Sequence, residues 1–337
     1  MNVALRPLLT AHLAEAQRLE PLLRRGQGGL YRYVDRLEEA DLIIWTDWPD
    51  YAQPLDALQR EDFRAHLDRS FAFSQQDRPL AFLPGLYTGL SGRADDTRRG
   101  GWYLEASAPD DALDAVAVDP RERDLWFTFA GGSTSWIRKR LLRHNFRRSD
   151  VRIVNTSAFH FWDPAQSGHG DRRAWYLDQL ARSRFVLCPR GACPSSIRLF
   201  ETMRAGRVPV ILSDAWVPPP FVEWRRFAVR VPERHFAHLP EILADYDPQA
   251  PEMGRIARTQ WERWLSLDRA GETLVAALLE IGLDAARQTP LTAWTWPARH
   301  RLQALRWQAR AQARDVALKA WRRSGLPMPY ALNRPND

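Results

Sequence analysis

Arginine, serine and glycine residues gather between residues 190 and 198 in a pattern typical of an anion-binding loop. Arg190 and Gly191 begin the segment, Ser195 and Ser196 follow, and Arg198 comes two residues later. Serine is a preferred N-cap residue, so this pair predicts the start of a helix that carries Arg198 in its first turn. Free backbone N–H groups and the positive end of the helix dipole favour a phosphate group there. The segment therefore predicts a diphosphate site, with Arg198 as the leading ligand and Arg190 as a support.

The elements around this loop are expected to place it at the edge of a sheet. The apolar run 185–188 ends at a proline, as in a parallel strand that is buried on both faces. The helix after the loop has a buried side and stops at Gly206, and the apolar run 208–212 predicts a second buried strand. Ligands of α/β sheets bind beyond the carboxyl ends of the strands. The loop 189–196 is thus in the right place to bind a nucleotide.

The same stretch resembles the exostosin-type family of glycosyltransferases, which is GT47-like, and in particular its bacterial members. The similarity rests on a polar cluster in the helix, the glycine that ends it, the second strand and the loop beyond, at Ser196, Arg198, Phe200, Glu201, Ala205, Gly206, Val208, Pro209, Val210, Ile211, Ser213, Asp214, Pro220, Trp224 and Phe227. A weaker similarity covers a strand and glycine turn at 125–132 and an arginine-bearing helix at 135–142. Within residues 1–120 only the stretch 83–87 is similar, so the acceptor half is poorly covered.

The resemblance implies an α/β, GT-B-like fold of two Rossmann-like parallel-sheet domains facing a cleft. It implies a glycosyltransferase that moves a hexosyl or glycuronosyl group from a nucleotide-sugar donor, expected to be UDP-linked, to a glycan or lipid-linked acceptor in surface polysaccharide biosynthesis. Glu201 is then the expected ribose ligand, and Arg138 supports the phosphates from across the cleft. The donor is a substrate, so no cofactor is expected.

We expect the transfer to be inverting and independent of metal. No Asp-x-Asp pair follows a predicted strand, so no metal ligands are assigned. Arginines and helix N-termini would then neutralise the leaving diphosphate.

No motif marks the general base that an inverting transfer needs. Asp47 follows a predicted strand at 42–45, and His160 lies in the presumed junction between the domains, so both are candidates for taking the proton of the acceptor hydroxyl. Each of them could equally be a turn residue or a helix cap, and that alternative stays open. Trp216 and Trp224 follow the second strand of the nucleotide site and are candidates for bordering the donor sugar.

Strands and helices alternate along the chain, which predicts two parallel-sheet domains. Strands of the first domain are expected at 42–45, 80–83, 124–129 and 151–154. This acceptor-side domain should span residues 1–165, and the nucleotide-sugar-binding domain should span residues 166–296. Residues 297–337 are expected to form a basic amphipathic helix and tail whose apolar stripe must be covered. The first domain is the expected cover, and an anionic membrane surface that contacts residues 297–330 is the alternative.

Charge and composition limit the partners and the location. The chain has 48 basic and 41 acidic residues, and its basic excess falls within 299–323, so the remainder is balanced and no nucleic-acid partner is expected. No apolar run reaches the ~18 residues of a membrane span, and the start of the chain lacks the pattern of a signal peptide. These features predict a cytoplasmic protein that could lie at the inner face of the membrane.

Two cysteines, Cys188 and Cys193, are too few for a zinc site and are expected to pack in the interior. Two other function classes stay open. One is a catalytically inactive relative that binds a glycan or a nucleotide. The other is nucleic-acid binding through the basic carboxyl-terminal helix, for which the sequence has no recognition motif.

Overall fold

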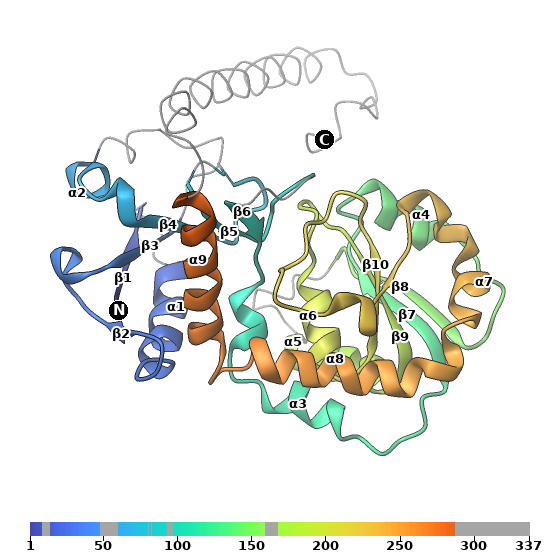
Figure 1. Cartoon of the computed structure of the whole chain (residues 1–337). Helices are drawn as coiled ribbons and strands as arrows, with labels where there is room; N and C mark the ends of the chain where they lie inside the picture. Colours follow the sequence, from blue (N-terminus) through green and yellow to red (C-terminus); the bar gives the residue numbers. More distant parts are fainter. Residues whose placement is uncertain are drawn as a thin grey trace, which may run out of the picture.

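The computed structural model describes residues 1–8, 14–47, 60–79, 81, 83–92, 97–158 and 168–286. These residues form two α/β units that lie side by side, each built on one parallel sheet (Figure 1). This is the GT-B-like fold class that the sequence predicted. His160 and the carboxyl-terminal segment 297–337 lie outside the described residues, so the expectations for them stay predictions.

The first sheet has six parallel strands in the order β2-β1-β3-β4-β5-β6. They are β1 (Asn2–Pro7), β2 (Arg32–Tyr33), β3 (Leu42–Thr46), β4 (Ser70–Ser74), β5 (Gly85–Tyr87) and β6 (Arg98–Gly100). Every residue of β3 is buried, as expected for a strand covered on both faces. The helix α1 (Ala14–Arg25) packs on β1, and its buried leucines join the core.

The second sheet has five strands in the order β11-β10-β9-β7-β8, again all parallel. They are β7 (Leu125–Gly131), β8 (Val151–Asn155), β9 (Ser183–Pro189), β10 (Val208–Leu212) and β11 (Val229–Arg230). The helices of this unit are α3 (Asp111–Ala117), α4 (Trp136–Arg143), α5 (His169–Arg182), α6 (Ile197–Arg204), α7 (Leu239–Ala244) and α8 (Ala250–Trp264). The strands β9 and β10 and the helix α6 confirm the expected order of elements around the loop 189–196.

The expected domain boundary at residue 165 would assign β7 and β8 to the first domain, which is wrong. β7 and β8 pair with β9 in the second sheet, so the change from the first sheet to the second occurs between β6 and β7. The last described helix, α9 (Ala270–Ala286), also departs from the expected division, because it packs on α1 of the first unit. Gly271 approaches the carbonyl group of Leu22 so closely that a Cβ atom would clash with it. The chain therefore returns to the first unit before residue 297.

The strand expected at 80–83 is also misplaced. Residues 81 and 83 have no regular structure, and the strands of this region are β4 and β5 on either side of them. Leu83 is nevertheless buried, which explains why the apolar run looked like a strand.

Several backbone contacts join the two units near the carboxyl ends of their strands. Ser91 forms an isolated antiparallel bridge with Trp216, and the N–H of Gly92 donates to the carbonyl of Ala215 at 3.1 Å. Gly100, the last residue of β6, lies against the carbonyl of Val217 with no room for a side chain. The edge of the first sheet therefore faces the loop after β10.

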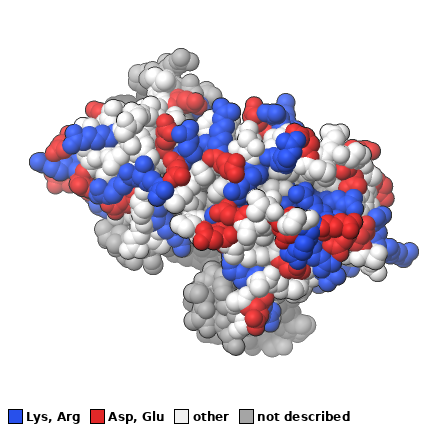
Figure 2. Space-filling model, turned by 90° about the horizontal axis from the view of Figure 1, so that it is seen from below, with Lys and Arg blue, Asp and Glu red and all other residues white. Residues whose placement is uncertain are grey.

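Surface charge is mixed over the described residues. Blue and red side chains alternate on the face seen from below (Figure 2), and many arginines pair with a neighbouring carboxylate. No helix in the described ranges is both long enough and apolar enough to cross a membrane.

Candidate functional site

The order of the second sheet creates a natural binding position between β7 and β9. These strands are neighbours, but the chain leaves β7 toward β8 and leaves β9 toward β10, in opposite directions. Right-handed crossovers then place α4 and α6 on opposite faces of the sheet. The loops after β7 and β9 diverge at this point and leave a crevice at the carboxyl edge, where open α/β sheets bind their ligands.

Two helices present their N-termini to this position. Ser135 is the N-cap of α4, and its Oγ accepts from the N–H of Arg138 at 3.4 Å and donates to the carbonyl of Arg190 at 2.8 Å. Ser196 is the N-cap of α6, but its hydroxyl makes no capping hydrogen bond. Arg138 and Arg198 stand in the first turns of these two helices. Both helix dipoles therefore favour negative charge at the same place.

Arg138 and Arg198 cross between the two strand ends. Arg138 follows β7 but donates from Nη2 to the carbonyl of Pro189 on β9 at 3.1 Å, and its Nη2 lies 3.5 Å from the Oγ of Ser196. Arg198 follows β9 but donates to the carbonyl of Ala130 on β7. Burial, and then the charge of Arg198, lower the pKa of Arg138 to about 9. The two guanidinium groups are thus held together in spite of their like charge.

Within the described part of the chain, neither arginine has a carboxylate partner in an ion pair. The Nε of Arg198 and the Oγ of Ser195 are buried without any hydrogen-bond partner. A Cβ on Gly191 would lie 3.4 Å from the Nη2 of Arg138, and one on Gly131 would lie 3.3 Å from the Nη2 of Arg198, so both glycines leave the guanidinium groups uncovered. Buried polar groups normally have partners. An anion at this place would supply them.

Glu201 lies one turn into α6 and is half-buried. It accepts a hydrogen bond at Oε2 from the hydroxyl of Tyr176 on α5, at 2.7 Å. Burial, and next the charge of Glu201, raise the pKa of Tyr176, so the phenol stays neutral and acts as the donor. Glu201 forms no ion pair with Arg198, although i, i+3 spacing would permit one. The carboxylate therefore keeps capacity for hydroxyl donors of a ligand.

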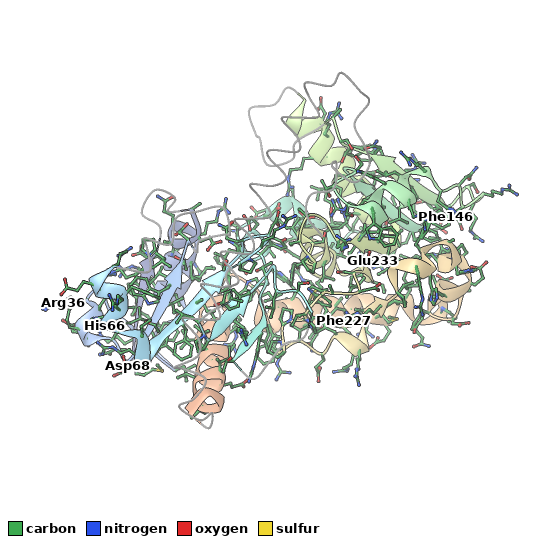
Figure 3. All side chains as sticks on the ribbon, turned by 90° about the horizontal axis from the view of Figure 1, so that it is seen from above. Arg36, His66, Asp68, Phe146, Phe227 and Glu233 are labelled. Atoms are coloured by element: carbon green, nitrogen blue, oxygen red, sulfur yellow. The ribbon has the colours of Figure 1, made fainter. Side chains whose placement is uncertain are left out.

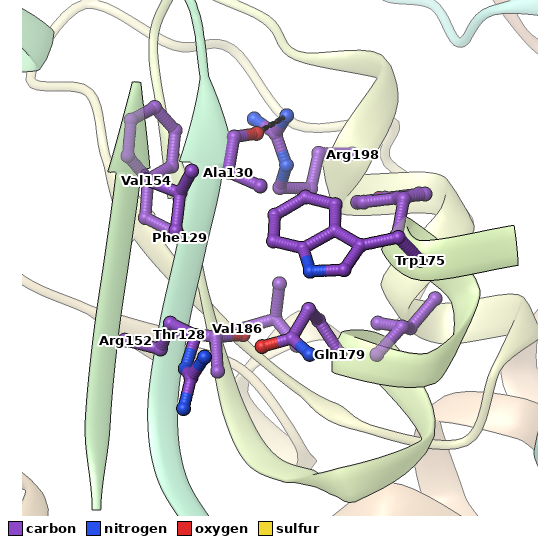
Figure 4. A pocket seen from close by; sticks show the side chains of 11 residues that line it. Thr128, Phe129, Ala130, Arg152, Val154, Trp175, Gln179, Val186 and Arg198 are labelled. Carbon is purple, nitrogen blue, oxygen red and sulfur yellow. Dashed lines mark hydrogen bonds between the residues drawn. The ribbon is translucent and has the colours of Figure 1, made fainter. Parts of the chain in front are cut away.

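A narrow pocket opens beside these residues, between α5 and the strands β7 and β8 (Figure 4). Arg198 forms its upper wall, Trp175 lies across it and Gln179 lies below. The Oε1 of Gln179 is buried without a partner. The pocket joins the arginine pair to Tyr176, the residue that positions Glu201.

Arg190 does not join the arginine pair. Its Nε donates to both carboxylate oxygens of Glu233, at 3.0 and 3.3 Å, and Glu233 is only 4% exposed. Glu233 also accepts from the backbone N–H of Asp214. This network ties the loop after β9 to the segment after β11. The expected role of Arg190 as a phosphate ligand is therefore replaced by a structural one.

Asp47 has a different role from the one considered for it. Its two carboxylate oxygens accept from the backbone N–H groups of Glu15 and Ala16, each at 3.0 Å, so it caps the N-terminus of α1. Glu15 returns the contact by accepting from the N–H of Asp47 at 3.0 Å. Asp47 is also only 3% exposed, so its carboxylate is enclosed and is not accessible to a substrate hydroxyl. Of the two base candidates, only His160 stays open, outside the described residues.

Of the two tryptophans considered for the donor sugar, Trp216 is packed in the interior, whereas Trp224 is half-buried and stays a candidate. Trp216 is 3% exposed and contacts Trp224 edge to face, with ring centroids 4.9 Å apart. Cys188 and Cys193 are free and buried, which confirms their packing role, and burial raises the pKa of each thiol to about 12.

Three polar residues of the site region were missed in the sequence. Tyr176 lies in an amphipathic helix where a tyrosine has no distinguishing signal. Glu15 is buried at the N-terminus of α1, and burial raises its pKa to about 7. Asp77 follows β4, a strand that the sequence analysis did not find.

The fold and the site together define an α/β protein with an anion site at the switch point of its second sheet. Residues 112–246 match the family model of the exostosin GT47 domain. Over this segment the chain is similar to the exostosin-type GT47 family, as the sequence resemblance implied.

Curated relatives match a part of the chain of similar length. The chain is 31% identical over 137 residues to "Exostosin-1 homolog" of Caenorhabditis elegans, covering 38% of this chain and 36% of that protein. It is 34% identical over 134 residues to "Probable glucuronoxylan glucuronosyltransferase IRX7" of Arabidopsis thaliana, covering 36% of this chain and 27% of that protein. The chain thus matches about a third or less of the length of these relatives.

Among solved structures, a glycosyltransferase from Rickettsia africae ESF-5 matches with a TM-score of 0.41 and 9% identity, covering 86% of this chain and 99% of that one. HepE from Anabaena, crystallised in complex with UDP, matches with a TM-score of 0.38 and 8% identity, covering 86% of this chain and all of that one (100%).

Proposed function

We propose that this protein is a glycosyltransferase that binds a nucleoside-diphosphate sugar in its second domain. The observation that carries the proposal is the pair Arg138 and Arg198, which cross at the switch point between two helix N-termini without a carboxylate partner among the described residues. A diphosphate would satisfy both guanidinium groups by charge-assisted hydrogen bonds. Similarity of residues 112–246 to the exostosin GT47 domain, and to a relative that is named a glucuronosyltransferase, supports a sugar as the transferred group.

The arrangement suggests how the donor would lie. The diphosphate would sit on Arg138, Arg198 and the hydroxyls of Ser195 and Ser196, and the ribose would lie toward Glu201. When the bond to the sugar breaks, negative charge grows on the leaving diphosphate. Fixed cations and helix N-termini stabilise such charge without rearranging.

The finer features of the proposal rest on the family resemblance and on this chemistry. The donor would be UDP-linked, the acceptor a glycan or a lipid-linked glycan, and the transfer inverting and independent of metal. The pathway would be surface polysaccharide biosynthesis, in the cytoplasm or at the inner face of its membrane.

Calorimetry with UDP, GDP and CDP, followed by turnover with the matching sugar nucleotides, tests the proposal. We expect UDP to bind at micromolar concentration and Glu201→Ala to weaken binding by roughly 1 to 3 kcal/mol, the cost of a lost hydrogen bond to a charged group. Because Glu201 would contact the ribose, this variant should lose less affinity for 2′-deoxy-UDP. Glu241→Ala, an exposed carboxylate on α7, is the matched control.

Each result leads to a different conclusion. Wild-type UDP affinity in Glu201→Ala removes the ribose assignment. Binding without turnover with any sugar nucleotide would favour a catalytically inactive binding protein. Absence of binding to all three nucleotides would refute the proposed donor site.

A further inference from the structure

Arg198 and Glu201 stand three residues apart on α6, a spacing at which an arginine and a carboxylate attract each other. An ion pair between them would satisfy both side chains and leave neither one for the proposed donor. The structure has them apart. The guanidinium group of Arg198 donates to the carbonyl of Ala130, and the carboxylate of Glu201 accepts from the hydroxyl of Tyr176. Some feature of the site therefore keeps the two charges from pairing.

Tyr176 on α5 contacts both charged side chains. Its hydroxyl donates to the Oε2 of Glu201 at 2.7 Å, and the Cζ of Arg198 lies 6.0 Å from the centroid of its ring. The face of an aromatic ring attracts a guanidinium group at such a distance. Tyr176 is only 6% exposed, so the surrounding core fixes the place of its ring and its hydroxyl. One residue thus binds the carboxylate through its hydroxyl and the cation through its ring.

A second ring, that of Phe129 in β7, also holds Arg198. The Cζ of Arg198 lies 5.0 Å from the centroid of this ring. A Cβ on Gly131 would lie 2.6 Å from the Cζ of Phe129, so the glycine leaves the ring its room. Figure 4 shows Arg198 at the upper wall of the pocket, with its hydrogen bond to Ala130. Uncharged groups therefore hold the guanidinium group in place, and its positive charge is left for an anion.

The hydroxyl of Tyr176 is the part of this arrangement that restrains Glu201. Without it, the Oε2 of this half-buried carboxylate would lose its hydrogen-bond donor, which costs free energy. Arg198 is a donor on the same face of the same helix, and its Nε has no partner. Glu201 would then turn to Arg198. That ion pair would neutralise the cation that a diphosphate needs and would draw the carboxylate away from a ribose.

We propose that Tyr176 is a positioning residue that keeps Arg198 and Glu201 from pairing with each other, an inference that rests on the proposed function. Arg198 then stays ready for the diphosphate of the donor, and Glu201 for its ribose. Loss of the Tyr176 hydroxyl should therefore weaken the binding of an anion that has no ribose at all. Loss of the negative charge of Glu201 should restore that binding.

Inorganic diphosphate is the probe, because it would contact only the arginine side of the site. Calorimetry on the full chain measures its affinity, and that of UDP, for Tyr176→Phe, Glu201→Gln and the double variant. We expect Tyr176→Phe to bind diphosphate about tenfold more weakly or worse, the effect of a lost charge-assisted hydrogen bond. In this background Glu201→Gln should restore the affinity to about that of the wild type, because a neutral amide forms no ion pair. In the wild-type background Glu201→Gln should change diphosphate affinity by less than about threefold, since Tyr176 already holds the carboxylate.

Tyr33→Phe is the matched control, because it removes the hydroxyl of another tyrosine with an arginine over its ring. Tyr33 is in β2, and the Cζ of Arg24 lies 4.3 Å from its ring centroid. It stands three residues before Arg36, which lies at the far end of the first unit (Figure 3). Glu233, the partner of Arg190 in the loop before α6, lies in the second unit, well away from Arg36 (Figure 3). This control should bind diphosphate and UDP as the wild type does.

Two results overturn the inference alone. One is wild-type diphosphate affinity in Tyr176→Phe. The other is an effect of Glu201→Gln by the same factor in both backgrounds, because residues that act independently have additive effects. Thermal melting monitors the fold, and Tyr176→Met, which also lacks the hydroxyl donor, takes the place of Tyr176→Phe if that variant melts early. A wild type that binds neither diphosphate nor UDP refutes the proposed function, and the inference falls with it.

Discussion

Replacing Arg138 by methionine should weaken nucleotide binding while leaving the free protein as stable as before, or more stable. Arg138 is a buried cation that contacts the carbonyl of Pro189 and the hydroxyl of Ser196, with Arg198 as its charged neighbour. Burial and Arg198 lower its pKa to about 9, so the folded protein disfavours the charge that the side chain carries at pH 7. Methionine keeps the length of the side chain and removes the charge.

The substitution is expected to change the stability of the free protein and its affinity for the nucleotide in opposite directions. One pKa unit corresponds to about 1.4 kcal/mol, so the lowered pKa of Arg138 costs the folded protein on the order of a few kcal/mol. Methionine recovers part of this energy and loses three hydrogen bonds of about 1 kcal/mol each, two to the carbonyl of Pro189 and one to the hydroxyl of Ser196. A charge-assisted hydrogen bond to a phosphate is worth about 1.5 to 3 kcal/mol. Its loss corresponds to UDP binding about 10- to 150-fold more weakly.

Thermal melting without ligand and calorimetry with UDP measure the two effects separately. Arg143→Met serves as the control, because Arg143 is an exposed arginine in the last turn of the same helix. We expect this control to bind UDP as the wild type does. If Arg138→Met melted far below the wild type and bound UDP with unchanged affinity, Arg138 would be a structural residue, and the assignment of the anion site would be wrong.

Four further predictions concern other parts of the molecule. Burial raises the pKa of Glu15 to about 7, above its value of about 4.5 in an unfolded chain, so the stabilising effect of its bound proton is complete below pH 4.5 and is lost as the pH rises through 7. The melting temperature of the wild type, measured as its difference from that of Glu15→Gln, should therefore fall as the pH rises from 5 to 8. A difference that stays constant over this range would contradict the raised pKa. Arg190→Gln should leave UDP affinity within threefold of wild type, whereas Glu233→Ala should lower the unfolding free energy by about 3 kcal/mol in denaturant titrations, because a buried ion pair loses one partner. Turnover should persist in excess EDTA, and loss of activity that manganese or magnesium restores would show a metal requirement. Truncation at Pro297 should abolish any salt-sensitive binding to anionic vesicles, and absence of vesicle binding by the full chain at low salt would exclude the membrane contact.

The nucleotide side of the site could be predicted because its signals are local. Ser135 and Ser196 are N-cap residues, each followed within three positions by an arginine, and both helices begin where the sequence indicated. The apolar runs of β9 and β10 are short; the first ends at Pro189, and the second begins two residues after Gly206. Each of these features is set within a few residues, so the sequence alone is sufficient to read it.

Sheet membership could not be predicted in the same way. Strands and helices alternate in the same way whether the chain continues one sheet or begins another. The sheet to which a strand belongs is decided by the strands it pairs with, and these can be distant in sequence. The pairing of β7 with β9 joins Leu125 to Ser183, across 58 residues. The return of α9 to α1 depends on the fit of Gly271 against Leu22, far apart in the chain. The expected boundary was therefore wrong where the topology is not local.

The predicted roles of individual polar residues were wrong for the same reason. Arg190 has the sequence position of a phosphate ligand, but its side chain forms an ion pair with Glu233, 43 residues further along the chain. Asp47 follows a strand, as a catalytic carboxylate often does, but the N-terminus of α1 takes up both of its oxygens.

Unfavourable electrostatics concentrate where the two units face each other. Arg138 and Arg198 lie together without an acid among the described residues, the Oγ of Ser195 has no partner, and on the opposite side Glu15 is buried with a raised pKa. Such groups lower the stability of the free protein, and folding alone gives no reason to keep them. A ligand that satisfies the arginine side binds only the folded state, and at 100 times its Kd it stabilises that state by about 2.7 kcal/mol. The cost in the free protein and the affinity for a diphosphate thus have one physical origin, because the same unpaired groups produce both.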